Sequence, residues 1–238
     1  MNLLLEQIYQ TRQVEDAEGN AINPFPTATA YELGKVFYDL IQEEKLERTL
    51  EVGMAYGLST LFICQAHSDK GTGHHTAIDP NQNSLWRSIG KLNIEKAGFA
   101  DRFRFFEACS HEVLPQLLAN GEQFDFAFID GMHLFDYALV DFFYIDKMLR
   151  VGGYVIFDDI WMPSIRKVLY FVVQNKAYEL IKFSTQQNLR KRASRMARRF
   201  LQDPLERDYK GIKFTPENIC ILRKLSEDNR HWEFHRSF

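Results

Sequence analysis

A regular alternation of short apolar runs with longer amphipathic segments begins near residue 49 and constrains the fold more than any other feature. Runs such as 124–130 (FDFAFID) and 152–159 (GGYVIFDD) are typical of strands buried on both faces. The segments between such runs, for example 136–150, carry apolar side chains at helical spacing. Strands separated by helices of about ten to fifteen residues form parallel sheets covered on both faces. We therefore predict an α/β fold, a doubly wound and mostly parallel seven-stranded sheet.

The expected elements also suggest a division of the chain. Two helices, at 2–14 and 30–44, precede the alternation, and a turn-rich connector at 19–28 joins them. We predict N-terminal helices at 1–45 and a ligand-binding domain at 46–238. The seven strands are expected at 49–53, 74–79, 102–108, 124–130, 152–159, 178–183 and 218–225.

A basic segment at 184–213 interrupts the alternation before the last expected strand. Its apolar residues at 189, 193, 196 and 200 form one helical stripe, and its other faces are cationic. We predict a helical insert that packs over the domain or over a twin subunit as a solvated helix. Two other roles remain as alternatives for this segment: a lid that attracts an anionic acceptor, and a contact with an acidic partner.

Composition excludes several classes of function. The net charge of −3 gives no general attraction to nucleic acid or to a membrane. Three cysteines, Cys64, Cys109 and Cys220, stand far apart without a CxxC pair, which argues against a disulfide framework or a zinc cluster. The first residues lack the pattern of a signal peptide, and no apolar run has the roughly 18–20 residues of a membrane helix. We expect a cytoplasmic protein without a membrane partner.

A glycine-containing loop follows the first expected strand and opens the next helix. It reads Glu51-Val-Gly53-Met-Ala55-Tyr-Gly57-Leu-Ser59. Glycines let the backbone turn sharply and approach a ligand, and the helix N-terminus offers free N–H groups to a carboxylate or phosphate. Ala55 replaces the middle glycine of the dinucleotide fingerprint, so a pyrophosphate fits this loop less well.

Asp79 ends the second expected strand, about 20 residues after the loop. A carboxylate at that distance can accept hydrogen bonds from both ribose hydroxyls of a nucleoside. The alternative is a structural one, in which the loop is a tight turn and Asp79 caps the turn before Pro80.

The pattern E-x-G-x-x-x-G-x-S with Asp79 resembles the class I S-adenosylmethionine-dependent methyltransferases. The resemblance is nearest to the catechol O-methyltransferase-like group and the related bacterial small-molecule methyltransferases. It runs from about residue 30 to 183, with a looser match at 218–225.

The resemblance implies a Rossmann-like fold, S-adenosylmethionine as cofactor and specific roles for the matching residues. Glu51 opens the cofactor-binding loop, Gly53 and Gly57 line the methionine portion, and Ser59 meets its carboxylate. Asp79 holds the ribose. Cys109, Ser110 and His111 follow the third expected strand and border the adenine.

Three acidic residues end two further strands: Asp130 closes 124–130, and Asp158 with Asp159 closes 152–159. We expect these strands to be neighbours, so that the three carboxylates share one crevice and repel one another unless protonated or bridged by a cation. Oxygen ligands of this kind suit Mg²⁺. In the resembling enzymes the matching positions hold a divalent metal. Asp130 could instead contact the cofactor without a metal, and Asp159 could cap the turn before Pro163.

His133 lies three residues after Asp130 and is the candidate general base, because the pKa of histidine lies near the working pH. Animal catechol methyltransferases place a lysine at this offset, and many bacterial relatives place an aspartate where this chain has Met132. His133 could also be an N-terminal helix residue that only bonds a carboxylate. With His133, Asp130 is the second candidate catalytic residue.

We predict O-methylation of a small hydroxylated molecule, with metal-assisted and metal-free reactions both open. The alternatives are an NAD(P)-dependent oxidoreductase and a non-catalytic adenosyl-binding protein. A nucleic-acid substrate is disfavoured, because the chain has no NPPY- or DPPY-type motif for a flipped base. The leading helix and the segment 184–213 offer apolar surface for a homodimer.

Overall fold

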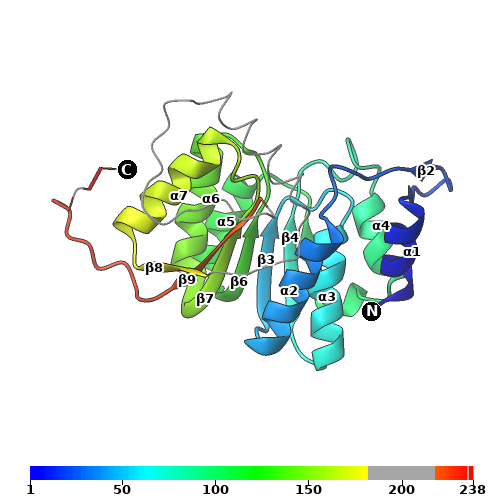
Figure 1. Cartoon of the computed structure of the whole chain (residues 1–238), viewed down its shortest axis with the longest axis horizontal. Helices are drawn as coiled ribbons and strands as arrows, with labels where there is room; N and C mark the ends of the chain where they lie inside the picture. Colours follow the sequence, from blue (N-terminus) through cyan, green and yellow to red (C-terminus); the bar gives the residue numbers. More distant parts are fainter. Residues whose placement is uncertain (182–217, 235, 238) are drawn as a thin grey trace, which may run out of the picture.

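The computed structural model describes residues 1–181, 218–234 and 236–237 (Figure 1). The strands in these ranges are β1 (Val14–Glu15), β2 (Ala21–Ile22), β3 (Arg48–Val52), β4 (His74–Ile78), β5 (Phe103–Phe106), β6 (Phe124–Ile129), β7 (Leu149–Phe157), β8 (Tyr178–Ile181) and β9 (Cys220–Lys224). The helices are α1 (Leu3–Thr11), α2 (Tyr31–Glu43), α3 (Leu58–Lys70), α4 (Ile89–Lys96), α5 (Ser110–Ala119), α6 (Phe135–Met148) and α7 (Pro163–Asn175), with a 3₁₀ turn at Ala100–Arg102.

The central sheet has the order β5-β4-β3-β6-β7-β9-β8. Strands β3 to β7 pair in parallel, whereas β9 runs antiparallel to both of its neighbours. The predicted doubly wound, mostly parallel seven-stranded sheet is confirmed. The chain moves outward from β3 to β5 and then returns to the other side of β3 with β6. The carboxyl ends of β3 and β6 therefore flank the topological switch point, where open α/β sheets bind ligands.

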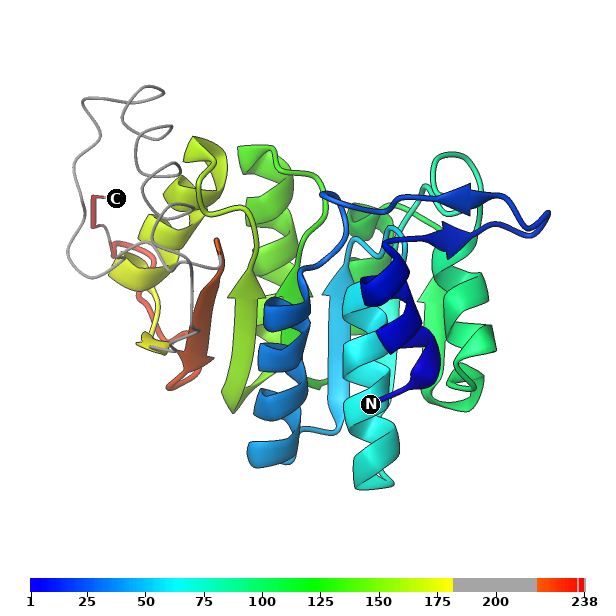
Figure 2. The same cartoon turned by 45° about the vertical axis from the view of Figure 1, so that its right-hand side comes forward.

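Both faces of the sheet are covered, as the apolar runs predict (Figure 2). On β6, Phe126 and Phe128 pack into a core shared with α2 and α3. The alternate residues Ala127 and Ile129 pack into the core beneath α5, α6 and α7. Because successive side chains of a strand point to opposite faces, a strand between two helical layers is apolar at most of its positions.

The N-terminal part differs from the expected pair of helices joined by a connector. Helix α1 buries Leu5 and Ile8 in a core shared with α3 and α4. A small hairpin, β1 with β2, then precedes α2. The carboxylate of Asp16 holds this hairpin, because its Oδ1 accepts hydrogen bonds from the backbone N–H groups of Glu18 and Asn20. The division at residue 45 stays a prediction.

Between the second and third strands the sequence SLWRSIGKLNIEKAG at 84–98 predicts a helix across its whole length, but α4 begins only at Ile89. Arg87 and Ser88 adopt left-handed backbone conformations, with φ of 50° and 55°. Such residues cannot continue a right-handed helix, so residues 80–88 form an irregular loop at the carboxyl edge of the sheet.

The predicted basic insert at 184–213 lies outside the described residues. No helix in the described ranges has the length and apolar character needed to cross a membrane.

Candidate functional site

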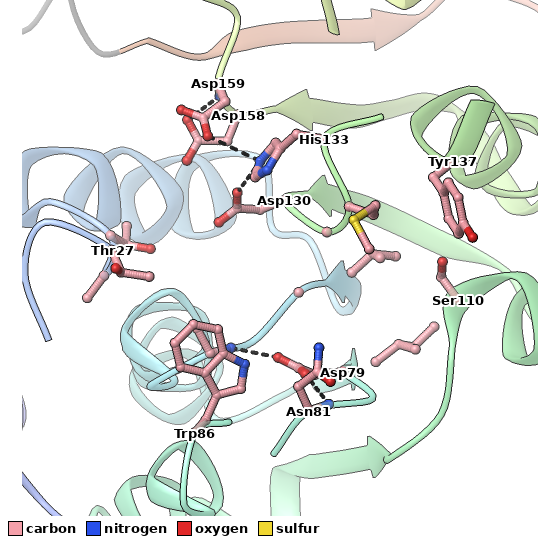
Figure 3. Close-up of a pocket in the computed structure, with 18 of the residues that line it drawn as sticks. Thr27, Asp79, Asn81, Trp86, Ser110, Asp130, His133, Tyr137, Asp158 and Asp159 are labelled. Carbon is pink, nitrogen blue, oxygen red and sulfur yellow. Dashed lines mark hydrogen bonds and ion pairs between the residues drawn. The ribbon is translucent and has the colours of Figure 1, made fainter. Parts of the chain in front are cut away.

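A cavity of about 650 Å³ lies at the carboxyl edge of the parallel strands (Figure 3). Its walls come from every loop that leaves this edge and from two distant parts of the chain. The lining residues include 26–30 and Leu33, Val52, Gly53 and Ala55, Ile78–Asn81 and Trp86, Cys109–His111, Asp130–His133 and Tyr137, Asp158 and Asp159, and Asn218.

Gly53 is required by close packing at the switch point. Its φ is +91°, and a Cβ built on it would lie 2.0 Å from the carbonyl oxygen of Asp130. The glycine thus lets the loop after β3 touch the end of β6 directly. Gly57 has φ +77°, and its Cβ would lie 3.0 Å from both Cα and O of Gly90. Gly57 therefore serves the contact between the loop and α4.

Asp79 holds the glycine loop in place. Its Oδ2 accepts hydrogen bonds from the backbone N–H groups of Met54 (3.0 Å) and Ala55 (2.8 Å), and its Oδ1 accepts one from Asn81 N–H (2.8 Å). The side-chain amide of Gln82 donates to the carbonyl of Ala55 at 2.6 Å. Asp79 is 3% exposed yet lines the cavity, so its carboxylate both orders the loop and faces a ligand.

Three residues predicted to contact the cofactor do not line the cavity in the described structure: Glu51, Gly57 and Ser59. Glu51 is fully buried beneath the loop, where its carboxylate accepts a hydrogen bond from Thr60 and lies 3.3 Å from Nε2 of His75. Glu51 belongs to β3, and this strand residue two positions before Gly53 points into the layer below the cavity.

Cys109, Ser110 and His111, which were expected to border the adenine, line the opposite wall of the cavity at the start of α5. The imidazole of His111 meets the ring of Tyr137 edge to face, with ring centroids 5.9 Å apart. Behind this wall, burial raises the pKa of Asp141 to about 6, and its hydrogen bond with Ser110 opposes that rise.

A compact group of ionisable side chains lies at the other end of the cavity, and we call Asp130, His133 and Asp159 the carboxylate–histidine group (Figure 3). Nε2 of His133 lies 3.3 Å from Oδ1 of Asp130 and 3.2 Å from Oδ2 of Asp159. One potential ligand atom from each of the three residues lies within 4.8 Å of the others. The imidazole thus stands between two carboxylates.

The grouping differs from the predicted set of three aspartates. Asp158 lines the same cavity, but its Oδ1 accepts a hydrogen bond from Asp159 N–H at 2.7 Å, and it is not part of the group within 4.8 Å. His133 takes its place. The backbone of Asp159 has φ 50°, a left-handed conformation, and its Oδ2 faces His133.

The local electrostatics favour a charged imidazole. The hydrogen bond to Asp130 raises the pKa of His133. The negative charges of Asp130 and Asp159 raise it further, whereas burial lowers it. Burial raises the pKa of Asp130, and its hydrogen bond with His133 opposes the rise. Proton exchange among these groups needs little movement, because the atoms already lie within hydrogen-bonding reach.

Several lining residues were not foreseen as site residues. Thr27 lies in the segment expected to be a connector and Thr29 directly follows that segment, and Asn81 and Trp86 lie in the irregular loop before α4. The run of turn-forming residues after Asp79, PNQN, was an available signal that no helix starts there. Asn218 had no such signal, because it comes from the far end of the chain.

Comparisons with known proteins find similarity to methyltransferases. Residues 50–160 match a family model described as a methyltransferase domain. The chain is 30% identical over 142 residues to the caffeoyl-CoA O-methyltransferase of Populus kitakamiensis, with 56% of each protein covered. It is 33% identical over 138 residues to tricin synthase 1 of Oryza sativa subsp. japonica, covering 53% of this chain and 50% of that protein. The chain spans about half the length of the curated relatives it matches.

A solved structure extends the similarity to nearly the whole chain. The O-methyltransferase TomG from Streptomyces achromogenes, crystallised in complex with SAM, has a TM-score of 0.66 at 15% identity. The alignment covers 95% of this chain and 91% of that chain. At this identity the similarity shows a shared fold.

Proposed function

Because the chain belongs by fold and by its matched domain to the class I S-adenosylmethionine-dependent methyltransferases, we propose that it methylates a hydroxyl group of a small molecule. One observation carries the proposal. A single cavity at the switch point joins the loop ordered by Asp79 to the carboxylate–histidine group. The first suits a nucleoside, and the second suits a hydroxyl that must lose a proton.

The cofactor is assigned to the end of the cavity that contains Asp79. The N–H groups of Met54 and Ala55 use both lone-pair sites of Oδ2, whereas Oδ1 accepts only from Asn81 N–H and keeps one site that can accept a ribose hydroxyl. Gly53 lets the loop approach the ligand closely, and Ser110 and His111 form the wall assigned to the adenine. The carboxylates of the cavity also favour the positive charge of the sulfonium.

The reaction is an in-line displacement at the methyl carbon. The acceptor oxygen forms the new O–CH₃ bond, the S–CH₃ bond breaks, and its electron pair stays on sulfur, giving S-adenosylhomocysteine. The acceptor proton passes to Nε2 of His133 in the fraction of molecules whose imidazole is neutral. Asp130 and Asp159, which raise the pKa of His133, then stabilise the imidazolium that forms. Catalysis then depends mainly on alignment and deprotonation.

A divalent cation is implied by the family resemblance, and the donor set fits one. Asp130 and Asp159 offer carboxylate oxygens that would hold it, and Asp158 adds a third carboxylate at the same strand end. When present, such an ion would lower the pKa of an acceptor hydroxyl beside it.

Three further assignments belong to the proposal. The acceptor is a small molecule rather than a nucleic acid. The protein acts in the cytoplasm, in keeping with Cys64, Cys109 and Cys220, which are free thiols. A homodimer is the proposed assembly.

The test is methyl transfer from S-adenosylmethionine labelled in the methyl group to a panel of small hydroxylated compounds, with and without Mg²⁺ or chelator. We expect label in an O-methyl product and an equal amount of S-adenosylhomocysteine. Loss of transfer with chelator and its return with Mg²⁺ would support metal assistance. Cofactor binding without transfer to any acceptor would contradict the proposal and leave a non-catalytic adenosyl-binding protein.

A further inference from the structure

The two oxygens of the Asp159 carboxylate have different partners. Oδ1 accepts two hydrogen bonds, from Nε1 of Trp161 and from Nδ2 of Asn218, both at 2.7 Å. Oδ2 lies 3.2 Å from Nε2 of His133 inside the cavity. A carboxylate held by two donors on one oxygen has a fixed plane, so the direction of its other oxygen is fixed as well.

Asn218 makes three contacts with the loop that carries Asp159. Besides its bond to Asp159, its Oδ1 accepts from Trp161 N–H at 3.0 Å, and its backbone carbonyl accepts from Ile160 N–H at 3.1 Å. These partners also determine which end of the amide faces Asp159, because only the NH₂ group can donate to a carboxylate.

The backbone explains why asparagine suits this position. Asn218 has φ 65° and Asp159 has φ 50°, so both adopt a left-handed conformation that most side chains disfavour and that asparagine and aspartate tolerate. Arg166, fully buried on α7, holds the same loop through the carbonyls of Ile160 and Trp161. The loop is therefore held on one side by α7 and on the other by Asn218, which lies two residues before the start of β9.

We propose that Asn218 is a positioning residue that acts through Asp159, directing Oδ2 toward His133 and the acceptor. The inference rests on the proposed function, since it gives the last strand of the sheet a part in that reaction. It needs no contact between Asn218 and the acceptor. Trp161 supplies the second donor to the same oxygen and shares the role.

The test is a double-mutant cycle between Asn218→Gly and Asp159→Gly. Glycine removes each side chain without strain at a left-handed backbone. We expect Asn218→Gly to lower kcat by about 10- to 100-fold, the size expected when a reacting group is misplaced by about 1 Å. Its affinity for S-adenosylhomocysteine should stay within about twofold, because Asp79 lies at the other end of the cavity. In the Asp159→Gly background, Asn218→Gly should have no further effect on kcat.

Asn218→Asp, which is isosteric, and Trp161→Phe, which keeps an aromatic ring, provide further checks, because each removes one donor to Oδ1 of Asp159. Both should lower kcat. Trp232→Phe, on an indole that is 84% exposed, is the matched control and should leave kcat unchanged.

The contact itself is observable without activity. The indole N–H resonance of Trp161, identified by its loss in Trp161→Phe, should shift and exchange faster with solvent in Asn218→Gly.

The inference would be overturned if the losses in kcat from Asn218→Gly and Asp159→Gly multiply in the double variant, or if the indole resonance of Trp161 does not shift in Asn218→Gly. Neither result would contradict methyl transfer by the wild type. Absence of transfer by the wild type would overturn the proposed function, and the role given to Asn218 with it.

Discussion

At the residue scale, Asp79 has two roles, and a single substitution can test them apart from the folding of the protein. It orders the glycine loop through Met54 and Ala55, and it faces the position assigned to the ribose. Asp79→Asn keeps the shape but removes the charge and one acceptor. We expect a loss of about 2–3 kcal/mol in the binding of S-adenosylhomocysteine, because charge-assisted acceptors in a buried site are the strong ones.

Calorimetric titration with S-adenosylhomocysteine measures this loss directly. Asp39→Asn is the matched control, because Asp39 is exposed on α2, where it pairs with Lys35, and does not line the cavity. Its affinity should equal that of the wild type. An unchanged affinity in a folded Asp79→Asn variant would contradict the ribose assignment and would mean that Asp79 only orders the glycine loop.

His133→Ala should separate proton transfer from cofactor binding. Nε2 of His133 faces Asp130 and Asp159, at the end of the cavity away from Asp79. We expect kcat to fall by about 10²- to 10⁴-fold, the usual contribution of a general base, with little change in cofactor affinity. Raising the pH should restore part of the loss, because the acceptor then ionises unaided. A variant with wild-type turnover would show that His133 is only a carboxylate partner.

Sequence reasoning located the residues of this group but not their contacts. Asp130, Asp158 and Asp159 were predictable because polar residues at the ends of buried strands share one sheet edge. It was not predictable which of the three would contact His133, because that depends on the left-handed backbone of Asp159 and on the hydrogen bond that Asn218 donates to Asp159. No local pattern in the sequence encodes either feature.

At the scale of the elements, the strands were predictable and the loops were not. Each strand of the central sheet begins and ends within a few residues of its expected bounds, because burial on both faces demands a continuous apolar run. The late start of α4 and the hairpin β1–β2 were missed. The first depends on left-handed conformations at Arg87 and Ser88, which are residue types that give no warning of them.

The contact between the loop after β3 and the end of β6 is testable with glycine substitutions. Gly53→Ala and Gly19→Ala both introduce a Cβ at positive φ, a cost of about 1–2 kcal/mol. Only Gly53→Ala also introduces an overlap, with the carbonyl of Asp130, since nothing lies within 4 Å of the Cβ at Gly19. We expect Gly53→Ala to be clearly less stable in urea denaturation and to bind S-adenosylhomocysteine poorly. Equal stability of the two variants would contradict the close approach.

The packing of α3 on the sheet predicts a pH dependence of stability. His67 is fully buried, with Nε2 2.9 Å from Oγ1 of Thr49, and burial lowers its pKa to about 3, with a further decrease from nearby His75. In the unfolded chain the pKa is about 6.5, so the unfolded state binds a proton first as the pH falls. His67 therefore lowers the free energy of unfolding between about pH 6.5 and 3, by about 2 kcal/mol at pH 5.

Urea denaturation at pH 7 and pH 5 measures this effect. The decrease in the free energy of unfolding should be about 2 kcal/mol smaller in His67→Gln than in the wild type. His231→Gln, at an exposed position, should reproduce the wild-type decrease. If His67→Gln and the wild type lose equal stability on acidification, His67 is not buried in its neutral form.

At the scale of the whole molecule, the cavity is assembled from parts of the chain that lie far apart in sequence. The middle of the chain supplies the loops after β3 to β7, the segment 26–30 supplies a wall, and Asn218 supplies a support from the far end. The sequence indicated the edge of the sheet at which a ligand binds, because the order of elements determines the switch point. It did not indicate which distant segments close that edge.

The central claim is that this cavity binds an adenosyl cofactor of the methionine type. Isothermal titration of the wild-type protein with S-adenosylhomocysteine, and in parallel with NAD⁺ and NADP⁺, tests it most directly. We predict saturable binding of S-adenosylhomocysteine with one site per chain and no binding of either dinucleotide, because Ala55 stands where a pyrophosphate-binding loop has its middle glycine. Binding of a dinucleotide in place of S-adenosylhomocysteine, or no binding of S-adenosylhomocysteine by the folded protein, would contradict the account.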